Sequence, residues 1–346
     1  MHLLNPSTSK SFAPVSGLRR AVLAFGAIVL LAVPCGSRAA DLSSATRALL
    51  DGNADSAIAQ SRQILAADSS NGQAHLLLCR AYYAQSMASA ASSECAAALR
   101  TLANDSSAQD WAGRAYGMQA DGAGPIAGLR LALKVRNAFE AAVRLNPLNG
   151  DAVNDLSEYY IDAPSIVGGG FEKAAVLADR SQAQLPQNAH RMRAMSAEKQ
   201  KDFGTAEREF RAAAAVANQP NAWADLGAFY SRRSQPEKAV EALRRAILLD
   251  RAHDATLVDA ATTLTEINRD PRLAERALRD YLDSRAKSDA APAFKVHVQL
   301  AKLLRDEGNT DEAKIELQHS LELASGYAPA RRELAAIEHE ATIAAR

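Results

Sequence analysis

The sequence has 346 residues, of which 48% are hydrophobic and only 5% aromatic, and its 40 basic side chains balance its 40 acidic ones. Alanine and leucine supply most of the hydrophobic share, so the composition favours an all-helical protein, either one repeat array or two ordinary domains. The first 40 residues hold four basic and no acidic side chains, which leaves 36 basic against 40 acidic groups in the remainder. This balance argues against a nucleic-acid partner, because nucleic-acid binding needs a basic face.

The amino terminus, residues 1–40, is typical of a cleaved signal peptide. Arg19 and Arg20 precede an apolar stretch over residues 21–33, and small residues follow up to Ala40, where a signal peptidase can cut. The stretch is shorter than the roughly 20 residues of a permanent transmembrane helix. We therefore expect export, to the periplasm of a Gram-negative bacterium, with anchoring in the inner membrane by residues 21–36 as the alternative.

The clearest internal pattern lies in residues 220–253. Apolar and small residues recur there at three- and four-residue intervals in two stretches, one with Gly227 and Tyr230 and one with Ala239 and Leu243. This spacing lines one face of each of two helices. Gly227 and Ala239 are interpreted as small residues that let the two antiparallel helices approach closely.

This pattern resembles the tetratricopeptide repeat (TPR), a helix–turn–helix unit of 34 residues, and it recurs along the chain. The resemblance, which extends to a group of exported bacterial TPR proteins of unassigned function, implies an all-α fold. The expected architecture is a right-handed superhelical solenoid of antiparallel helix pairs, which stack because no pair can bury its apolar face alone. The expected units are residues 41–71, 72–105, 106–149, 150–186, 187–219, 220–253, 254–290 and 294–327, with a capping helix over residues 328–346.

Two segments are longer than the repeat requires. Residues 117–134 contain several glycines before an expected helix, which is compatible with a phosphate-binding loop or with a loop and an extended second helix. The second interpretation is preferred because no strand precedes the glycines and the lysine that a nucleotide-binding loop would need is missing. Residues 163–170 contain three glycines beside Ile166 and Val167. They are either a mobile contact element for a partner or a tolerated insertion, since surface loops accept added length at little cost.

No motif in the sequence indicates a catalytic, metal-binding or cofactor-binding site. The histidines are scattered, and no two have the four-residue spacing of a helical zinc site. Cys79 and Cys95 are expected to face each other across one helical hairpin. The sequence leaves open whether they form a disulfide or stay as buried thiols, because a disulfide needs Cα atoms within about 7 Å whereas packed helices usually lie about 8–10 Å apart.

The resemblance also implies where a partner binds, because TPR arrays use the concave surface formed by the first helix of each pair. The positions that this places in the groove are Leu76, Arg80, Tyr83, Asp110, Arg114, Asn154, Glu158, Asp162, Arg191 and Lys302. We predict that a partner peptide lies along Tyr83, Arg80 and Arg114. The lysines and asparagines of the family's carboxylate clamp are not present as a set, which argues against a cytosolic co-chaperone.

The sequence therefore predicts a non-catalytic scaffold that binds a protein or peptide partner in the cell envelope. The alternative is a periplasmic chaperone, or holdase, for unfolded envelope proteins. The identity of the partner and the oligomeric state do not follow from the sequence, because function depends on the residues of the groove rather than on the scaffold.

Overall fold

A computed structural model describes residues 41–217 and 219–344, and within them the chain forms 17 α-helices and one short 3-10 helix, with no strand. The predicted signal peptide, residues 1–40, lies outside the described residues. The helices are α1 (Leu42–Leu50), α2 (Ala54–Ala67), α3 (Gly72–Ala84), α4 (Ala88–Ala98), α5 (Ser106–Asp121), α6 (Pro125–Leu145), α7 (Gly150–Asp162), η1 (Ser165–Val167), α8 (Phe171–Ser181), α9 (Pro186–Lys199), α10 (Phe203–Ala217), α11 (Pro220–Arg232), α12 (Pro236–Leu249), α13 (Ala255–Glu266), α14 (Pro271–Asp283), α15 (Ala293–Asp306), α16 (Thr310–Leu323) and α17 (Ala328–Ala344).

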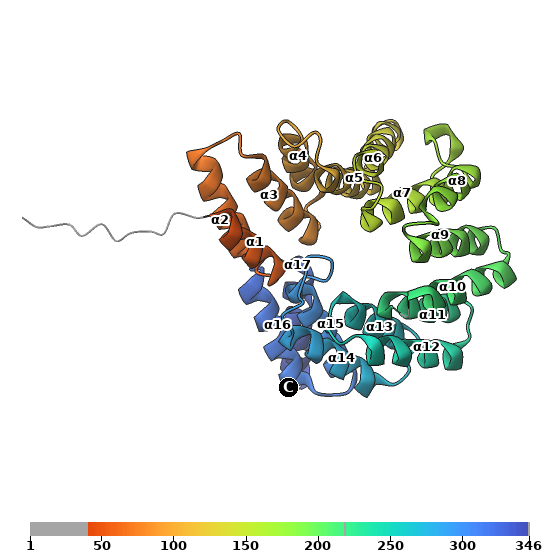
Figure 1. The fold of residues 1–346 in the computed structure, drawn as a ribbon. Coiled ribbons are helices and arrows are strands. Elements are labelled where there is room, and N and C mark those ends of the chain that lie inside the picture. Colours follow the sequence, from red (N-terminus) through yellow and green to blue (C-terminus); the bar gives the residue numbers. More distant parts are fainter. Residues whose placement is uncertain (1–40, 218, 345–346) are drawn as a thin grey trace, which may run out of the picture. The chain divides into compact units, whose positions relative to one another are not determined.

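The helices pack as consecutive pairs, from α1–α2 to α15–α16, and α17 packs against α16. First helices of most neighbouring pairs also contact one another, for example α5 with α7 and α11 with α13, and together they line the inner side of the array (Figure 1). The all-helical array of stacked pairs that the sequence predicts is confirmed. None of the helices in the described part of the chain combines the length and the apolar character needed to span a membrane.

Capping residues set where several helices begin, and a recurrent turn connects the two helices of a pair. Asn71, Asp105 and Asn149 each precede a first helix, and their side chains accept hydrogen bonds from backbone N–H groups of the first turn. Such caps satisfy donors that the helix itself leaves free. Inside the pairs, one turn geometry recurs in six units, with a positive φ at the second residue after the first helix. The residues are Gly52, Ser86, Lys201, Ser234, Asn268 and Gly308.

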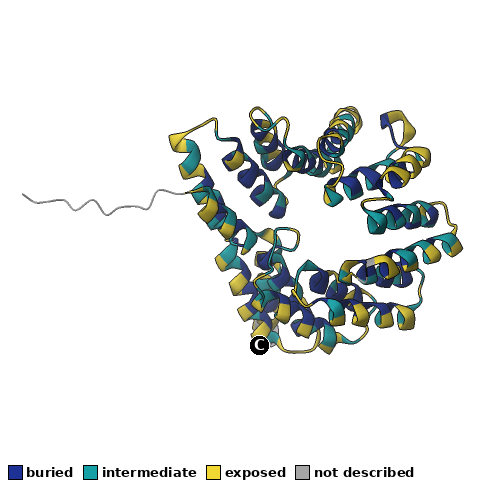
Figure 2. Ribbon diagram, viewed as in Figure 1, coloured by how far each residue is buried: buried dark blue, intermediate teal, exposed yellow. Residues whose placement is uncertain are grey.

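Small residues allow the close contact of paired helices, as expected. A Cβ atom added to Gly227 on α11 would lie 2.6 Å from the side chain of Leu243 on α12. Gly113 on α5 is covered in the same way by the ring of Phe139 on α6, 2.3 Å from such an atom. The packed faces of the helices are buried, and the exposed positions lie largely on the outer sides of the second helices (Figure 2).

A disulfide joins the helices of the second pair. Cys79 on α3 and Cys95 on α4 are bonded through their sulfur atoms, with their Cα atoms 5.1 Å apart. Both residues are fully buried, and alanines such as Ala91 and Ala98 surround them. These small side chains bring the two helices closer than is usual for packed helices, which answers the question that the sequence left open.

The two segments longer than the repeat have different structures. Residues 117–134 extend both helices of the third pair, because α5 continues to Asp121 and α6 begins at Pro125, with only a short turn between them. Residues 163–170 form η1 and a compact loop, in which the carbonyl of Val167 accepts a hydrogen bond from the Tyr159 hydroxyl at 2.9 Å. Of the two apolar side chains in this segment, Val167 is buried and Ile166 is exposed.

The first unit contacts the last units, so the two ends of the array meet. In Figure 1, α2 lies beside α16, and the two helices are in contact. The Arg80 guanidinium of α3 donates two hydrogen bonds to Asp289, at 2.7 and 2.9 Å. The backbone N–H of Ser325 donates to Asp55 at 2.8 Å.

Apolar packing reinforces the contact between the ends. Ala54 and Ala84 from the first two units share a buried cluster with Phe294 and Ala324 from the last. Gly52 lies so close to Ala293 that an added Cβ would stand 2.5 Å from its backbone nitrogen. The array is therefore closed by specific contacts between residues more than 200 positions apart.

Candidate functional site

The inner wall of the array contains a polar cavity of about 610 Å³. Its lining comes from the first helices of five consecutive units, α5, α7, α9, α11 and α13. Six carboxylates but only two guanidinium groups line it, so we refer to it as the acidic groove. Its charged residues are Asp151, Asp155, Glu158, Asp225, Asp259, Glu266, Arg114 and Arg191.

Polar side chains 34 residues apart connect neighbouring first helices along this wall. The amide of Asn188 donates to Asn154 at 3.0 Å, and the guanidinium of Arg191 donates to Asp225 at 3.1 Å. The repeat has the same length, so residues at this offset occupy equivalent positions on adjacent helices. The groove is thus lined by columns of equivalent residues that contact each other from unit to unit.

Arg191 lies at the middle of the acidic groove and is shared by two carboxylates. Its guanidinium contacts Glu158 on α7 at 2.8 Å and Asp225 on α11 at 3.1 Å. Burial raises the pKa of Asp225, and the nearby Arg191 acts in the opposite direction. The Nη1 atom of Arg191 is buried and has no hydrogen-bond partner among the described residues.

Arg114 occupies the corresponding place at one end of the groove. It contacts Asp155 at 2.5 Å and Asp110 at 3.2 Å. Burial raises the pKa of Asp110 to about 7, an effect that Arg114 reduces and Asp155 strengthens. Two carboxylates therefore compete for one guanidinium in a poorly hydrated place, and their ionised forms are disfavoured.

Asp259 continues the column of Arg191 and Asp225, since it lies 34 residues after Asp225. Its side chain is exposed toward the groove and makes no hydrogen bond or ion pair with the described residues. Although the side chain of Asp259 is accessible from the groove, the surrounding concave wall limits its hydration and raises its pKa to about 6, and the charge of Asp225 adds to this rise. No cation among the described residues contacts Asp259 directly, and Arg191 only lowers its pKa from a distance.

The sequence predicted some of this site and misplaced other parts of it. Arg114, Asn154, Glu158 and Arg191 line the acidic groove, and Asp110 is buried next to Arg114. The remaining predicted residues lie elsewhere: Leu76, Arg80, Tyr83, Asp162 and Lys302.

The prediction that Leu76 lies in the groove is wrong, because its side chain is 5% exposed and packs in the apolar core of α3, α4 and α5. Arg80 is held by Asp289 where the ends of the array meet. Asp162 pairs with Lys199 at 2.6 Å, and Lys302 pairs with Glu333 of α17 at 3.2 Å. Residues at the expected register positions are thus distributed between the core, the closure and exposed ion pairs.

The predicted peptide path along Tyr83, Arg80 and Arg114 corresponds to a real cluster around Trp111. The Tyr83 ring meets Trp111 edge-on at 5.5 Å, and the guanidinium groups of Arg80 and Arg114 lie 5.3 and 4.8 Å from its ring centre. Both guanidinium groups are already paired with carboxylates. This cluster therefore presents no free cation to an acidic partner.

The acidic residues Asp155, Asp225 and Asp259 were not among the groove residues predicted from the sequence. The signal that could have found them is the 34-residue offset, which relates Asp225 and Asp259 to Arg191. A second cavity, of about 750 Å³, lies between α6, α7 and α8 and has a more apolar lining that includes Val176 and Leu177. Carboxylates with raised pKa values gather in the acidic groove instead, and such clusters are typical of functional sites.

Comparison with known proteins locates the repeats. The sequence model of the family described as Tetratricopeptide repeat matches residues 220–253 and 294–327, which contain α11–α12 and α15–α16. No curated protein matches the chain.

Two solved structures are similar. The crystal structure of the APC/C hetero-tetramer Cut9–Hcn1 is 14% identical, with a TM-score of 0.39, over 86% of this chain and 55% of that chain. This chain therefore spans little more than half of that one. A thermophilic TPR protein from Thermus thermophilus is 13% identical, with a TM-score of 0.42, over 65% of this chain and 100% of that chain. Together with the helical pairs described above, the family match shows that this chain contains tetratricopeptide repeats.

Proposed function

We propose that this chain is a non-catalytic scaffold that binds a basic segment of a partner protein in the acidic groove. Proteins with tetratricopeptide repeats generally mediate protein–protein interactions. The observation that carries the proposal is the charge of the groove, where six carboxylates face two guanidinium groups. Complementary charge across an interface gives specificity and speeds association.

The electrostatics of the acidic groove favour a cationic occupant. The pKa values of Asp155, Asp225 and Asp259 are all raised, first of all by burial. A lysine or arginine side chain that entered the groove would stabilise the ionised carboxylates and lower these pKa values. Asp259 is the best-placed anchor, because its carboxylate has no competing partner among the described residues.

The dimensions of the groove suggest an extended segment of moderate length. The lining comes from five first helices, and neighbouring packed helices lie about 8–10 Å apart. The wall therefore extends over roughly 35 Å, which an extended chain covers with about 10–12 residues. A short basic stretch of a partner is enough to cross all five helices.

The chemistry of the lining favours the scaffold over the holdase. A holdase binds exposed apolar segments, and it would need apolar side chains along its groove. The acidic groove is instead lined by charged and amide side chains, such as Asn154, Asn188 and Asn221.

We further propose that the protein works in the periplasm. Residues 1–40 have the pattern of a signal peptide, and the disulfide between Cys79 and Cys95 suits an oxidising compartment.

Calorimetric titration with two synthetic peptides tests the function. One alternates Lys and Ala over about 12 residues, and the other alternates Glu and Ala. We expect the lysine peptide to bind and the glutamate peptide not to bind. Asp259→Asn should weaken binding about fivefold, which corresponds to about 1 kcal/mol for one exposed charge pair.

The matched control is Asp280→Asn, which removes an exposed carboxylate on α14 outside the groove. It should leave the affinity unchanged. Equal binding of the two peptides, or equal effects of the two substitutions, would show that the acidic groove is not the binding site.

A further inference from the structure

A histidine–glutamate contact recurs between the two helices of three units. His75 contacts Glu94 at 2.6 Å, and His190 contacts Glu209 at 2.7 Å, each through Nδ1 and a carboxylate oxygen. His297 on α15 contacts Glu316 on α16 in the same way, at 2.6 Å. All three pairs are 19 residues apart. The contact itself is therefore a structural link that the repeat uses to join its helices.

Only the third of these units adds a second imidazole. The residue three positions after the glutamate is Ala97 in one unit and Ala212 in another, but it is His319 in the last. On a helix this spacing places both side chains on the same face. The His319 ring lies 5.4 Å from the His297 ring, centre to centre, and its Nδ1 atom is 3.8 Å from the Glu316 carboxylate.

The three side chains present ligand atoms at a separation close to that of a metal site. One atom from each of His297, Glu316 and His319 lies within 4.8 Å of the others. An ion such as Zn²⁺ binds imidazole nitrogen and carboxylate oxygen at about 2.0–2.2 Å, so its ligand atoms lie within about 4.4 Å of each other. Binding of the ion replaces the hydrogen bond between His297 and Glu316, which is 2.6 Å long, and it needs the half-exposed His319 side chain to rotate toward the ion.

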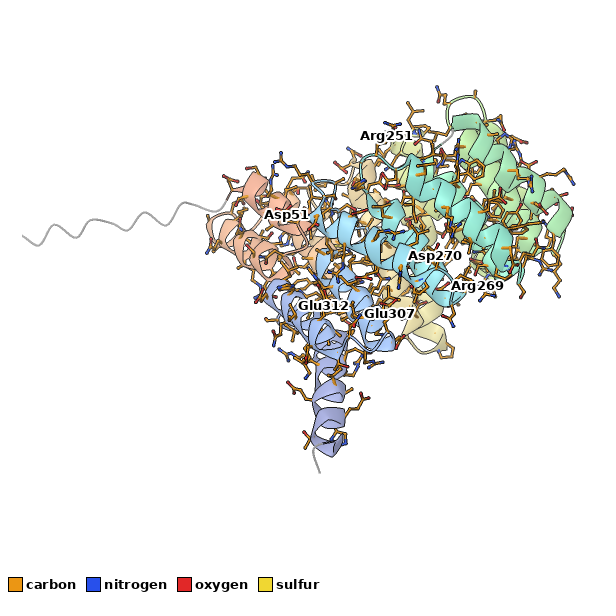
Figure 3. The ribbon with its side chains drawn as sticks, turned by 90° about the horizontal axis from the view of Figure 1, so that it is seen from below. Asp51, Arg251, Arg269, Asp270, Glu307 and Glu312 are labelled. Atoms are coloured by element: carbon orange, nitrogen blue, oxygen red, sulfur yellow. A yellow bond between two sulfur atoms is a disulfide. The ribbon has the colours of Figure 1, made fainter. Side chains whose placement is uncertain are left out.

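The surroundings hold the site in place and make it negative. Figure 3 labels Glu312, one turn before Glu316 on α16, and Glu307, which follows α15 at the same end of the hairpin. Arg279 of α14 binds Glu312 at 2.6 Å and Glu275 at 2.8 Å, and it approaches Glu316 to 3.8 Å. Three carboxylates against one guanidinium leave an excess of negative charge, which favours a divalent cation.

We propose that His297, Glu316 and His319 bind a divalent transition-metal ion, with Zn²⁺ as the best fit. Two imidazoles and one carboxylate are a ligand set that suits this ion, and water completes the coordination on the exposed side of His319. The ion links α15 to α16 on the surface of the last pair. The sequence did not predict this metal site, because helical zinc motifs have two histidines on one helix, whereas this set needs His297 from the helix before.

Titration of the purified protein, free of any histidine tag, with Zn²⁺ alone tests the proposal. We expect one ion per chain at this site, and His319→Ala should weaken its binding at least tenfold. His190→Ala is the matched control, because it removes the same type of histidine–glutamate contact from a unit that has Ala212 in place of a third ligand. It should leave Zn²⁺ binding unchanged.

Thermal unfolding gives a second measurement on the same proteins. Zn²⁺ should raise the melting temperature of the unaltered protein and of His190→Ala, but not that of His319→Ala. His319 is half exposed, so its replacement should not impair folding, which circular dichroism verifies. Equal affinity for Zn²⁺ in the unaltered protein and His319→Ala would overturn the proposal.

Discussion

The positions of individual carboxylates in the acidic groove raise their pKa values and disfavour their ionised forms. Asp225 and Asp259 occupy equivalent places on α11 and α13, and Arg191 reaches only the first of them. The pKa of Asp259 rises to about 6, first because of burial and then because of Asp225. Carboxylates placed in this way do not stabilise the isolated fold, but they can bind a cationic side chain of a partner.

Replacement of Asp259 by Asn should stabilise the protein in a pH-dependent way. The raised pKa means that the folded state binds more protons than the unfolded state between about pH 4 and pH 6. The natural protein therefore loses stability as the pH rises through this window. Asp259→Asn should unfold at a higher urea concentration than the natural protein at pH 8, and at a similar one below pH 4. If the urea midpoints of Asp259→Asn and the natural protein differed by the same amount at every pH, the result would contradict this explanation.

Binding of the basic peptide should also depend on pH. The pKa of Asp259 is about 6 and that of Asp110 about 7, both raised chiefly by burial. Protonation of these groups removes negative charge from the groove and from the wall beside it. The affinity for the lysine peptide should therefore fall between pH 8 and pH 5 and should fall less in Asp259→Asn. Titrations at several pH values and constant ionic strength measure how the affinity changes with pH in both proteins. An affinity of the natural protein that does not change with pH would show that these carboxylates do not contribute to binding.

The sequence predicts the positions of groove residues better than their environments. The repeat register placed Arg114, Asn154, Glu158 and Arg191 correctly, because residues on one helix face follow from spacing alone. It could not show that Leu76 is covered by the neighbouring unit, or that Asp289 engages Arg80. Burial and pairing depend on the exact rotation of each helix, which spacing alone does not determine.

Single helical pairs owe their close packing to small residues and, in one unit, to a covalent bond. The disulfide between Cys79 and Cys95 closes a loop with a sequence separation of 16. Loop closure of this length should stabilise the protein by about 3 kcal/mol, since it restricts the unfolded chain. Urea unfolding of the natural protein with and without reductant measures this difference.

A Cys79→Ala/Cys95→Ala variant serves as the control for the disulfide. Reductant should have no effect on its stability, because it contains no bond to reduce. The natural protein should also show no free thiol at these positions when it is unfolded without reductant. Stability that is unaffected by reductant in the natural protein would show that the bond is absent or without energetic effect.

Helical pairs are the level at which the sequence was most informative. The period of apolar residues identified the stacked helices, and Gly227 marked a close approach that the contact with Leu243 explains. The turn within the pairs was harder to recognise, because Ser86, Lys201 and Ser234 adopt positive φ values that glycine more commonly takes. The position of the disulfide cysteines was foreseen, but their distance depends on the alanine-rich packing of α3 and α4.

Contact between the first and last units distinguishes the array as a whole. Arg80 and Asp289 are largely buried there, with side chains 19% and 9% exposed. Arg80→Ala would leave the Asp289 carboxylate without its cation, which typically destabilises such a contact by about 3 kcal/mol. We expect the ends to separate, with a larger radius of gyration in small-angle X-ray scattering and faster hydrogen exchange in α1 and α2.

The matched control for the closure is Arg232→Ala. Arg232 also makes two hydrogen bonds to one carboxylate, that of Glu198, but within the wall between α9 and α11. Its loss should leave the radius of gyration and the exchange of α1 and α2 unchanged. The same expansion in both variants would mean that Arg80 has no specific role in the closure.

Closure could not be predicted from the sequence because it depends on a sum of small rotations. Each pair turns slightly relative to the previous one, and only the accumulated turn brings Ala54 to Phe294 and Asp55 to Ser325. Local patterns fix each pair but not this total. The acidic groove has the same origin, because curvature is what concentrates its carboxylates in one cavity.

Photo-crosslinking of the bound lysine peptide tests the central claim most directly. A photoreactive group at the middle of the peptide should, after irradiation and mass spectrometry, attach to residues of α7, α9, α11 or α13 that line the acidic groove. Excess unlabelled peptide should suppress this attachment, and Asp259→Asn should reduce it. Attachment mainly to the outer surfaces of α6, α8 or α12 would contradict the account.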